Sequence, residues 1–431
     1  MIARSLYYLY QLRRNLRLKP AALQEMQQKK LRAMIKHAYE NVPFYHMKFN
    51  QAGIGPDDVR SIDDLAKVPF TTKAEIQACP IEDIVARNVN LGKCVKRMTS
   101  GSTGIPLAIY LNRKVLNFET ALLYRAYLED GLRLRDRMVR ITEPSNLLKR
   151  RTWLQRLGIL RTEYVSIFDD VEKQFSLIES YNPEAIRGYA SCVALLADFC
   201  KETRKDIDPR LIFTGAELLD KKARQLVNSV FQTELFDLYV SMEFGVMAWE
   251  CLEHTGHHIN AESLLLEIVK NGVVGTDELG EIVCTSLTND VMPLIRYKIG
   301  DVGAILDEQC TCGVSLPLLK IIEGRTGDFL VTSSGRVVAP TVFFPYPFED
   351  VAWIRQFRII QESKEKIVFE IVLRDGYDGD EHILAHAAGK IRQLFGEDIE
   401  VVFKVVKKLQ ADPSGKLRKV ISRVPTHMAM S

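Results

Sequence analysis

The chain has 431 residues, which is too long for one compact core and indicates two or three domains. Hydrophobic residues make up 47% and charged residues 26% of it, a composition typical of soluble globular proteins and not of disordered ones. Because 58 basic and 55 acidic residues nearly balance to a formal charge of +3, we exclude a nucleic-acid binder that works through a global positive field.

The N-terminal segment, residues 1–19, has apolar residues near helical spacing, followed by Arg13, Arg14 and Arg17. It predicts an amphipathic helix that either packs on the protein body or makes peripheral contact with an anionic membrane. No segment has the ~20 apolar residues of a membrane span. Eight cysteines without a secretory signal do not form a disulfide framework, so we expect a cytoplasmic location.

Residues 1–90 are expected to form a helical leader, with helical spacing in "AALQEMQQKKLRAMIKHAYENV". The middle of the chain alternates strands and helices. There "LIFTG", "AELLDKKARQLVNSVF" and "TELFDLYV" follow in a strand–helix–strand order that indicates parallel α/β layers. After "IIEGRTGD", the segment "FLVTSSGRVVAP" predicts a hairpin, and further strands and one helix indicate a small α+β domain. We place the domain boundary between residues 327 and 328.

A Ser/Thr/Gly-rich connection joins the predicted strands "VKRM" and "PLAIYL". Its residues are Thr99, Ser100, Gly101, Ser102, Thr103 and Gly104. Gly101 and Gly104 can adopt positive φ, which lets successive N–H groups converge on an anion while the hydroxyls add donors. The spacing is not that of a Walker A loop. The connection is therefore either a plain hairpin turn or a phosphate-binding loop.

Further segments occur in a characteristic order along the chain: "TSGSTGIP", "FTGAE", "LYVSME", "IRYKIGD", "EGRTGD" and "DPSGKLRK". Together they resemble the adenylate-forming ligase superfamily, in particular the phenylacetate–coenzyme A ligase branch and its capsular-polysaccharide-associated relatives. The resemblance runs from "NVPFYHMKF" to Lys416. It implies an α/β fold with a large multi-sheet N-terminal adenylate-forming domain, residues 1–327, and a small, mobile α+β C-terminal lid domain, residues 328–431.

The resemblance also implies how ATP is held. The segment 99–104 would clasp the leaving β,γ-phosphates, although Ile105 stands where relatives often carry a basic residue. The main chain of Gly215, Ala216 and Glu217 would lie flat against the adenine, or else form an ordinary strand-to-helix turn.

Two side chains after the next strand would complete the adenine and phosphate contacts. Tyr239 would stack on the adenine ring, and Ser241 would lie near the α-phosphate. Both positions correspond to the family's "YGxTE" segment by resemblance, with Val240 in place of the common glycine.

The same resemblance assigns the charged residues of the reaction. Glu243 would hold Mg²⁺, a hard cation that prefers carboxylate and phosphate oxygens. Asp301 would accept the ribose hydroxyls, and Arg325 would bridge ribose or phosphate with its planar fork. Asp328 would be the hinge about which the small domain rotates, and Lys416 would neutralise charge as pyrophosphate leaves.

A separate set of metal-binding residue types occurs in "ECLEHTGHHIN" and "CTCG". These segments contain Cys251, His254, His257, His258, Cys310 and Cys312. Three thiolates and one imidazole would form a closed, structural Zn²⁺ site. By resemblance to Cys/His sets in which the histidine precedes Ile or Val, we favour His258. A redox-active dithiol and simple buried thiols are the alternatives.

These observations favour an ATP-dependent, AMP-forming ligase that joins a small, aromatic carboxylic acid to a thiol, most simply that of coenzyme A. Two alternatives stay open. One is an adenylyltransferase or carrier-protein-loading relative, and the other is a non-catalytic nucleotide-binding protein associated with polysaccharide synthesis. We expect small-molecule partners and no nucleic acid, and a homodimer would be ordinary.

Overall fold

The computed structural model describes residues 2–99, 106–143, 153–275, 279–325, 329–338, 347–348, 351, 353–412 and 416–424. The chain forms two compact units, each built from separated segments: Met1–Arg133 with Phe236–Ile322, and Leu134–Leu235 with Glu323–Ser431. The boundary expected between residues 327 and 328 falls in a segment outside the described residues and stays a prediction.

The first unit begins with a helical segment, as its spacing predicts. Its helices are α1 (Ile2–Asn15), α2 (Pro20–Asn41), α3 (Pro43–Gln51), α4 (Lys73–Ala78), α5 (Ile81–Ile84) and α6 (Arg113–Glu129). Helix α2 starts at Pro20, since proline at the first helical position loses no hydrogen bond. It buries Leu31, Ile35 and Ala38 along one face and ends just before Pro43, which disfavours helical backbone in the preceding residue.

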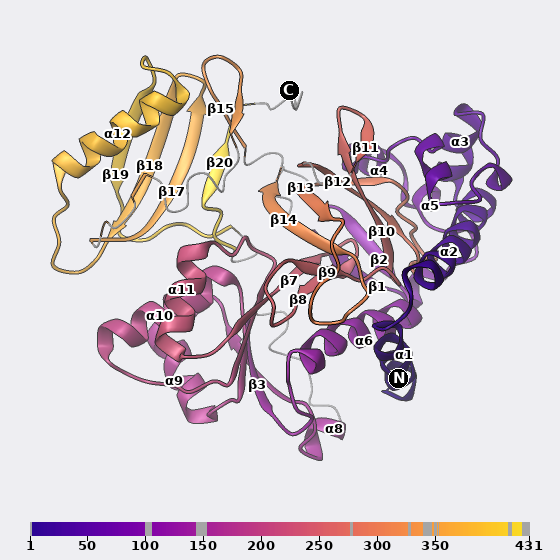
Figure 1. Ribbon diagram of the computed structural model, residues 1–431, viewed down its shortest axis with the longest axis horizontal. Coiled ribbons are helices and arrows are strands. Elements are labelled where there is room, and N and C mark those ends of the chain that lie inside the picture. Colours follow the sequence, from indigo (N-terminus) through magenta and orange to yellow (C-terminus); the bar gives the residue numbers. More distant parts are fainter. Residues whose placement is uncertain are drawn as a thin grey trace. The chain divides into compact units, whose positions relative to one another are not determined.

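Strands of the first unit form one long sheet and one hairpin. In the sheet the order is β11-β10-β12-β13-β14-β9-β8-β7, while β1 and β2 pair separately (Figure 1). The strands are β1 (Val95–Met98), β2 (Ala108–Leu111), β7 (Leu235–Ser241), β8 (Gly245–Glu250), β9 (His257–Ile259), β10 (Leu264–Lys270), β11 (Val273–Gly275), β12 (Gly280–Ser286), β13 (Tyr297–Leu306) and β14 (Leu318–Arg325). Their apolar faces share one core with α2 and α3.

A buried ion pair fixes α6 in this unit. Arg125 donates to Glu262 Oε1 at 2.6 Å and to Glu262 Oε2 at 3.1 Å, and both side chains are at most 1% exposed. Arg125 also donates to Asn260 Oδ1 at 2.5 Å and to the Leu12 carbonyl of α1 at 3.1 Å. The guanidinium therefore joins α1, α6 and the β9–β10 connection.

The second unit has a parallel sheet in the order β4-β3-β5-β6. Its strands and helices are β3 (Arg137–Thr142), α8 (Trp153–Arg156), β4 (Arg161–Ser166), α9 (Val171–Tyr181), β5 (Ala185–Arg187), α10 (Ala190–Thr203), β6 (Leu211–Gly215) and α11 (Lys221–Phe231). Strand β6 is buried along its whole length, as expected of a parallel strand covered on both faces. Helices α9, α10 and α11 share one apolar core with these strands.

The C-terminal part of this unit is a separate small α+β layer. It contains β15 (Leu330–Val331), β16 (Val337–Val338), β17 (Ile354–Ser363), β18 (Lys366–Leu373), α12 (Glu381–Phe395), β19 (Glu400–Val405) and β20 (Val420–Ser422). The sheet order is β19-β18-β17-β20, and α12 lies along this sheet (Figure 1), burying Ile391 and Phe395 against Ile359 and Phe369. Below we call residues 330–424 the C-terminal domain.

Several expectations are confirmed. The mixed α/β architecture with a smaller C-terminal domain is observed, the strands "VKRM" and "PLAIYL" pair as β1 and β2, and the Ser-Gly hairpin forms β15 and β16. Within the described residues, none of the helices is both long enough and apolar enough to cross a membrane.

The Arg125 pair gives a stability prediction. Arg125→Ala leaves Glu262 charged and buried without its partner, so the free energy of unfolding should fall by about 3–5 kcal/mol in urea denaturation. The control is Arg13→Ala, which removes an exposed pair with Glu129 of the same helix. It should cost about 1 kcal/mol or less. Equal losses for the two variants would contradict the assigned role of Arg125.

Candidate functional site

The connection between β1 and β2 is closed at its neck by Thr99. Its backbone N–H donates to the Leu107 carbonyl at 2.9 Å, and its hydroxyl accepts from the Leu107 N–H at 2.9 Å. The remaining loop residues, Ser100, Gly101, Ser102, Thr103 and Gly104, lie outside the described residues, as does Ile105. Their phosphate-binding role stays a prediction. The described part of the hairpin ends in the two hydrogen bonds between Thr99 and Leu107.

Two of the nucleotide residues predicted from sequence meet on neighbouring parts of the first unit. Tyr239, near the end of β7, donates its hydroxyl to Asp301 Oδ2 on β13 at 2.6 Å. Burial and, next, the Asp301 carboxylate raise the pKa of Tyr239 well above its ordinary value, so the phenol stays protonated and keeps donating. The bond fixes the orientation of the Asp301 carboxylate, as a ribose-binding acid requires.

Tyr239 itself is more buried than its predicted role suggests. Its ring belongs to the apolar core of the first unit and is only 7% exposed. The structure thus gives Tyr239 a function that sequence reasoning missed, the positioning of Asp301. Adenine stacking by Tyr239 stays a prediction.

The turn between β7 and β8 carries Ser241 and Glu243. Ser241 Oγ accepts from the Phe244 N–H at 3.0 Å, and Ser241 pairs with Gly245 across the turn. Glu243 is half-buried at this turn. The turn is tight because Gly245 has a φ of 69°, which favours glycine.

Glu119 of α6 braces this turn, which sequence reasoning also missed. A Cβ at Gly245 would lie 2.8 Å from the Glu119 carboxyl carbon. Arg97 of β1 donates to the same carboxylate at 2.5 Å. The Glu119 carboxylate is therefore bound to the hairpin that carries Thr99 and lies directly against Gly245 of the turn that carries Glu243.

In the second unit, the turn that follows β6 is hydrogen-bonded to the segment that contains Lys416. The Glu217 carboxylate accepts from the Ser191 N–H at 2.9 Å and from the Leu417 N–H at 2.8 Å. Burial raises the pKa of Glu217 above its ordinary value, and the two N–H donors oppose that effect. Ala216 beside it has a φ of 67°, a strained conformation for a residue with a Cβ.

Lys416 lies beside these groups. Its Nζ is 5.9 Å from the centre of the Tyr189 ring, whose hydroxyl donates to Glu143 Oε1 at 3.1 Å. The structure therefore brings Lys416 together with the 215–217 turn, as a shared nucleotide site requires. The Arg325 side chain and all of Asp328 lie outside the described residues, so their roles stay predictions.

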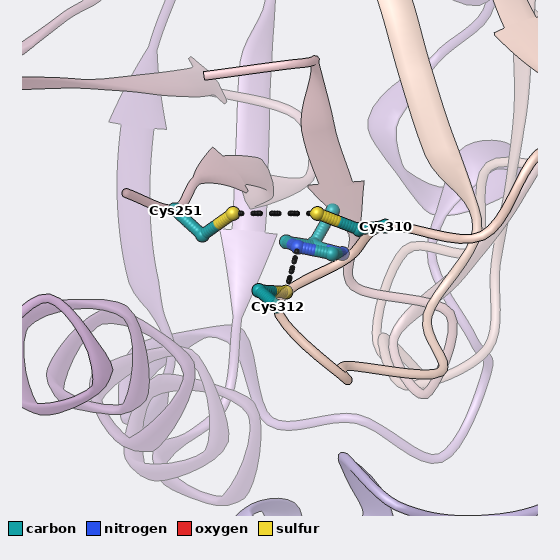
Figure 2. Close-up of side chains that lie close together, drawn as sticks. Cys251, Cys310 and Cys312 are labelled. Carbon is teal, nitrogen blue, oxygen red and sulfur yellow. Dashed lines mark hydrogen bonds between the residues drawn. The ribbon is translucent and has the colours of Figure 1, made fainter. Parts of the chain in front are cut away.

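The cysteine and histidine set gathers in the first unit. The ligand atoms of Cys251, His258, Cys310 and Cys312 all lie within 4.8 Å of one another. Within this set, Cys251 Sγ lies 3.6 Å from Cys310 Sγ, and Cys312 Sγ lies 3.3 Å from His258 Nε2. Figure 2 shows the three thiols pointing toward a common centre.

This arrangement suits a tetrahedral ion. Zinc binds thiolates at about 2.3 Å and imidazole at about 2.0–2.1 Å, so neighbouring ligand atoms lie roughly 3.5–3.8 Å apart. Burial lowers the pKa of His258 to about 4, which keeps the imidazole neutral and able to ligate at pH 7. Its Nδ1–H points at the Leu316 carbonyl at 3.5 Å, leaving Nε2 toward Cys312.

The other two histidines of the segment have different contacts. His254 Nδ1 lies 3.5 Å from Glu250 Oε2, and His257 Nε2 lies 3.2 Å from Asp237 Oδ2. Of the three histidines, the structure thus places His258 alone with the thiols, among the residues that it describes. None of the eight cysteines forms a disulfide in this structure.

Known proteins resemble this chain both in its C-terminal domain and over most of its length. A family model described as the CapK C-terminal domain matches residues 330–423. The phenylacetate–coenzyme A ligase of Pseudomonas putida is 31% identical over 336 residues, 72% of this chain and 72% of that protein. The phenylacetate–coenzyme A ligase of Thermus thermophilus is 26% identical and covers 93% of this chain and 96% of its own length.

A solved structure confirms the fold. The chain superposes on 2-hydroxyisobutyryl–coenzyme A ligase, crystallised in the postadenylation state with an acyl-AMP, with a TM-score of 0.77. The two are 18% identical, and the match covers 95% of this chain and 91% of the other. This likeness shows the fold of an adenylate-forming enzyme.

The contact at Gly245 generates a prediction. Gly245→Ala adds a Cβ against Glu119 in addition to backbone strain, and should lower the free energy of unfolding by about 2–3 kcal/mol. The matched control is Gly272→Ala, with a φ of 82° but open space around the Cβ. It should cost about 1 kcal/mol. Adding Glu119→Ser to Gly245→Ala should recover part of the loss, and equal effects at both glycines would contradict the contact.

Proposed function

The chain belongs to the phenylacetate–coenzyme A ligase family of adenylate-forming enzymes, and we propose that it activates a small aromatic carboxylic acid with ATP and transfers the acyl group to coenzyme A. At family level it is an ATP-dependent, AMP-forming acid–thiol ligase. The aromatic acid is proposed because phenylacetate is the substrate of the curated relatives.

One observation carries the proposal more than any other. The Glu217 carboxylate binds the Leu417 N–H at 2.8 Å and so holds the adjacent Lys416 at the turn that follows β6. The ammonium group of Lys416 is what the α-phosphate requires when negative charge develops there.

In the first half-reaction, a carboxylate oxygen of the acid attacks the α-phosphorus of ATP. The new O–P bond forms as the bond to the leaving pyrophosphate breaks, and Lys416 offsets the charge on the phosphate oxygens. Asp301, oriented by Tyr239, would hold the ribose hydroxyls so that the α-phosphate stays in line with the acid. Glu243 would hold Mg²⁺, which supplies positive charge to the phosphate oxygens when bound.

In the second half-reaction, the thiolate of coenzyme A attacks the carbonyl carbon of the acyl-adenylate. A C–S bond forms, the C–O bond to the phosphate breaks, and AMP leaves with the electron pair. Because Lys416 serves the first step only, we propose that the C-terminal domain moves away between the steps, with Asp328 as the hinge.

We also propose that Cys251, His258, Cys310 and Cys312 hold a structural zinc ion. Three thiolates and one imidazole fill a tetrahedral shell and leave no position for substrate or water. The ion would tie the loop between β13 and β14 to β8 and β9, and would take no part in the reaction. The short Cys251–Cys310 approach makes a redox-active dithiol the alternative outcome.

Lys416→Ala should lower carboxylate-dependent ATP–pyrophosphate exchange about 10²–10³-fold, because the charge at the α-phosphate is lost. Thioester formation from a synthetic acyl-adenylate and coenzyme A should be retained. Lys407→Ala, an exposed lysine of the same domain, serves as the control and should leave both rates unchanged. Unaltered exchange in Lys416→Ala would contradict the catalytic role.

The same assay, run on wild-type protein with a panel of acids, separates the alternatives. ATP–pyrophosphate exchange followed by transfer of the acyl or adenylyl group to a carrier protein or another acceptor, and not to coenzyme A, would identify a carrier-loading enzyme or an adenylyltransferase. ATP binding without exchange for any acid would identify a non-catalytic nucleotide-binding protein.

For the metal, elemental analysis of purified protein should give about one zinc per chain. Cys251→Ser and Cys312→Ser should each lose it, whereas Cys94→Ser, which lies outside the cluster, should keep it. Removal of the ion by a chelator should lower the melting temperature of the wild type and leave that of Cys251→Ser unchanged. If the purified wild type contained no metal and its mass showed a disulfide, the zinc hypothesis would be wrong and the redox-active dithiol would be favoured.

A further inference from the structure

Two arginines of the C-terminal domain close on the acidic end of helix α10. Arg374 donates from Nη1 to Asp198 Oδ1 at 2.8 Å and to Glu202 Oε1 at 2.7 Å. Arg355 donates from Nε to the other oxygen of Asp198 at 3.1 Å. Both carboxylate oxygens of Asp198 are thus engaged by cations from the C-terminal domain. We call these four side chains the ion-pair quartet.

Two acidic residues of helix α10 lie where the helix itself disfavours negative charge. Asp198 and Glu202 lie in its last two turns, where the helix dipole is negative and a carboxylate is disfavoured. Asp198 is also only 4% exposed, so water compensates its charge poorly. The two arginines supply the compensation, which means that the sequence of α10 is adapted to a partner from the C-terminal domain.

The segment that begins with Lys416 makes a second set of polar contacts with the same part of the unit. The Leu417 N–H bonds to Glu217, and Lys419 Nζ pairs with Asp220, which also caps α11 by accepting from the Ala223 N–H. Alternate residues of the segment therefore bind the 217–220 turn, and Lys416 lies at the start of this row.

The contact between these two parts is incompletely packed, and the hydrogen bonds and ion pairs described above cross it. The apolar core around α9, α10 and α11 contains residues from 139 to 235 only, and the core of the C-terminal domain contains residues from 330 to 420 only. A cavity of about 130 Å³ lies between them, lined by the charged groups of Asp198, Arg355 and Arg374 and by apolar side chains of both parts, such as Leu226 and Phe348. Each apolar core is nevertheless formed by one part alone.

From this geometry we infer that the ion-pair quartet is a separable dock that holds the C-terminal domain where Lys416 reaches the nucleotide site. Its members are positioning residues for the adenylation half-reaction and are not needed for thioester formation. The inference rests on the proposed function for its kinetic consequence. The dock itself is a property of the contacts described above.

The strength of such a dock suits a reversible step. Ion pairs exchange for water at little net cost when they become exposed, and salt screens them. An apolar interface of similar size would hold the domain in one position. Loss of one charge-assisted partner should therefore shift the balance between docked and released positions about 10- to 100-fold.

The test is Asp198→Asn, which keeps the shape of the side chain and removes its charge. Arg374→Gln, on the more exposed side of the quartet, is the second variant in case Asp198→Asn folds poorly. The control is Glu184→Gln, which breaks an ion pair with Arg137 in the same unit without involving the C-terminal domain. Each variant is measured as the full-length chain.

Hydrogen–deuterium exchange measures whether the segment is docked, independently of enzyme activity. In Asp198→Asn and Arg374→Gln, the Leu417 amide should exchange at least tenfold faster, because its bond to Glu217 is lost when the segment is released. Strands β6, β18 and β20, which stay paired within their own sheets, should exchange as in the wild type, and Glu184→Gln should leave the Leu417 amide unchanged. Unchanged exchange of the Leu417 amide in both variants would overturn the dock.

The rates of the two half-reactions test the role of the ion-pair quartet in catalysis. Both variants should lower ATP–pyrophosphate exchange about tenfold and leave thioester formation from a synthetic acyl-adenylate unchanged or faster. Equal losses in both half-reactions would mean that the quartet is merely structural and would overturn the inference. Absence of pyrophosphate exchange in the wild type would refute the proposed function instead, and hydrogen exchange would still decide whether the dock exists.

Discussion

One carboxylate holds the segment that carries the proposed catalytic lysine. Glu217 accepts hydrogen bonds from Ser191 at the start of α10 and from Leu417 near the end of the chain, so it joins three segments that are far apart in sequence. Desolvation raises the pKa of this carboxyl, and the Ser191 and Leu417 N–H groups and the Lys419 ammonium group favour its charged form. The position of Lys416, and with it the chemistry proposed for the α-phosphate, follows from this arrangement.

The two units use charge in different ways. In the first unit, the ion pair of Arg125 and Glu262 is almost completely buried, and the Cys/His cluster brings ligand atoms of β9, of the residue that follows β8 and of the β13–β14 loop within 4.8 Å of one another. In the second unit, the ion pairs at Asp198 join two apolar cores that remain separate. A ligase with two half-reactions needs both a fixed platform and a part that can be released.

Sequence patterns predicted what depends on neighbouring residues. The periodicity of α2, the strand pair around Thr99, the β6–α11–β7 order and the C-terminal hairpin were all readable, and the choice of His258 over His254 and His257 agrees with the geometry. The patterns could not reveal Glu119 against Gly245, Tyr239 on Asp301, or Asp198 beneath two arginines. Each of these joins residues from distant segments, and a single sequence does not record which distant side chains meet.

A crystal structure with a non-hydrolysable acyl-adenylate analogue would test the central claim most directly. The account predicts that Lys416 Nζ lies within hydrogen-bond distance of the group replacing the α-phosphate while Glu217 still holds the Leu417 N–H, with the ribose hydroxyls on Asp301. An analogue bound elsewhere, or bound with Lys416 remote from the phosphate position in every orientation of the C-terminal domain, would contradict it.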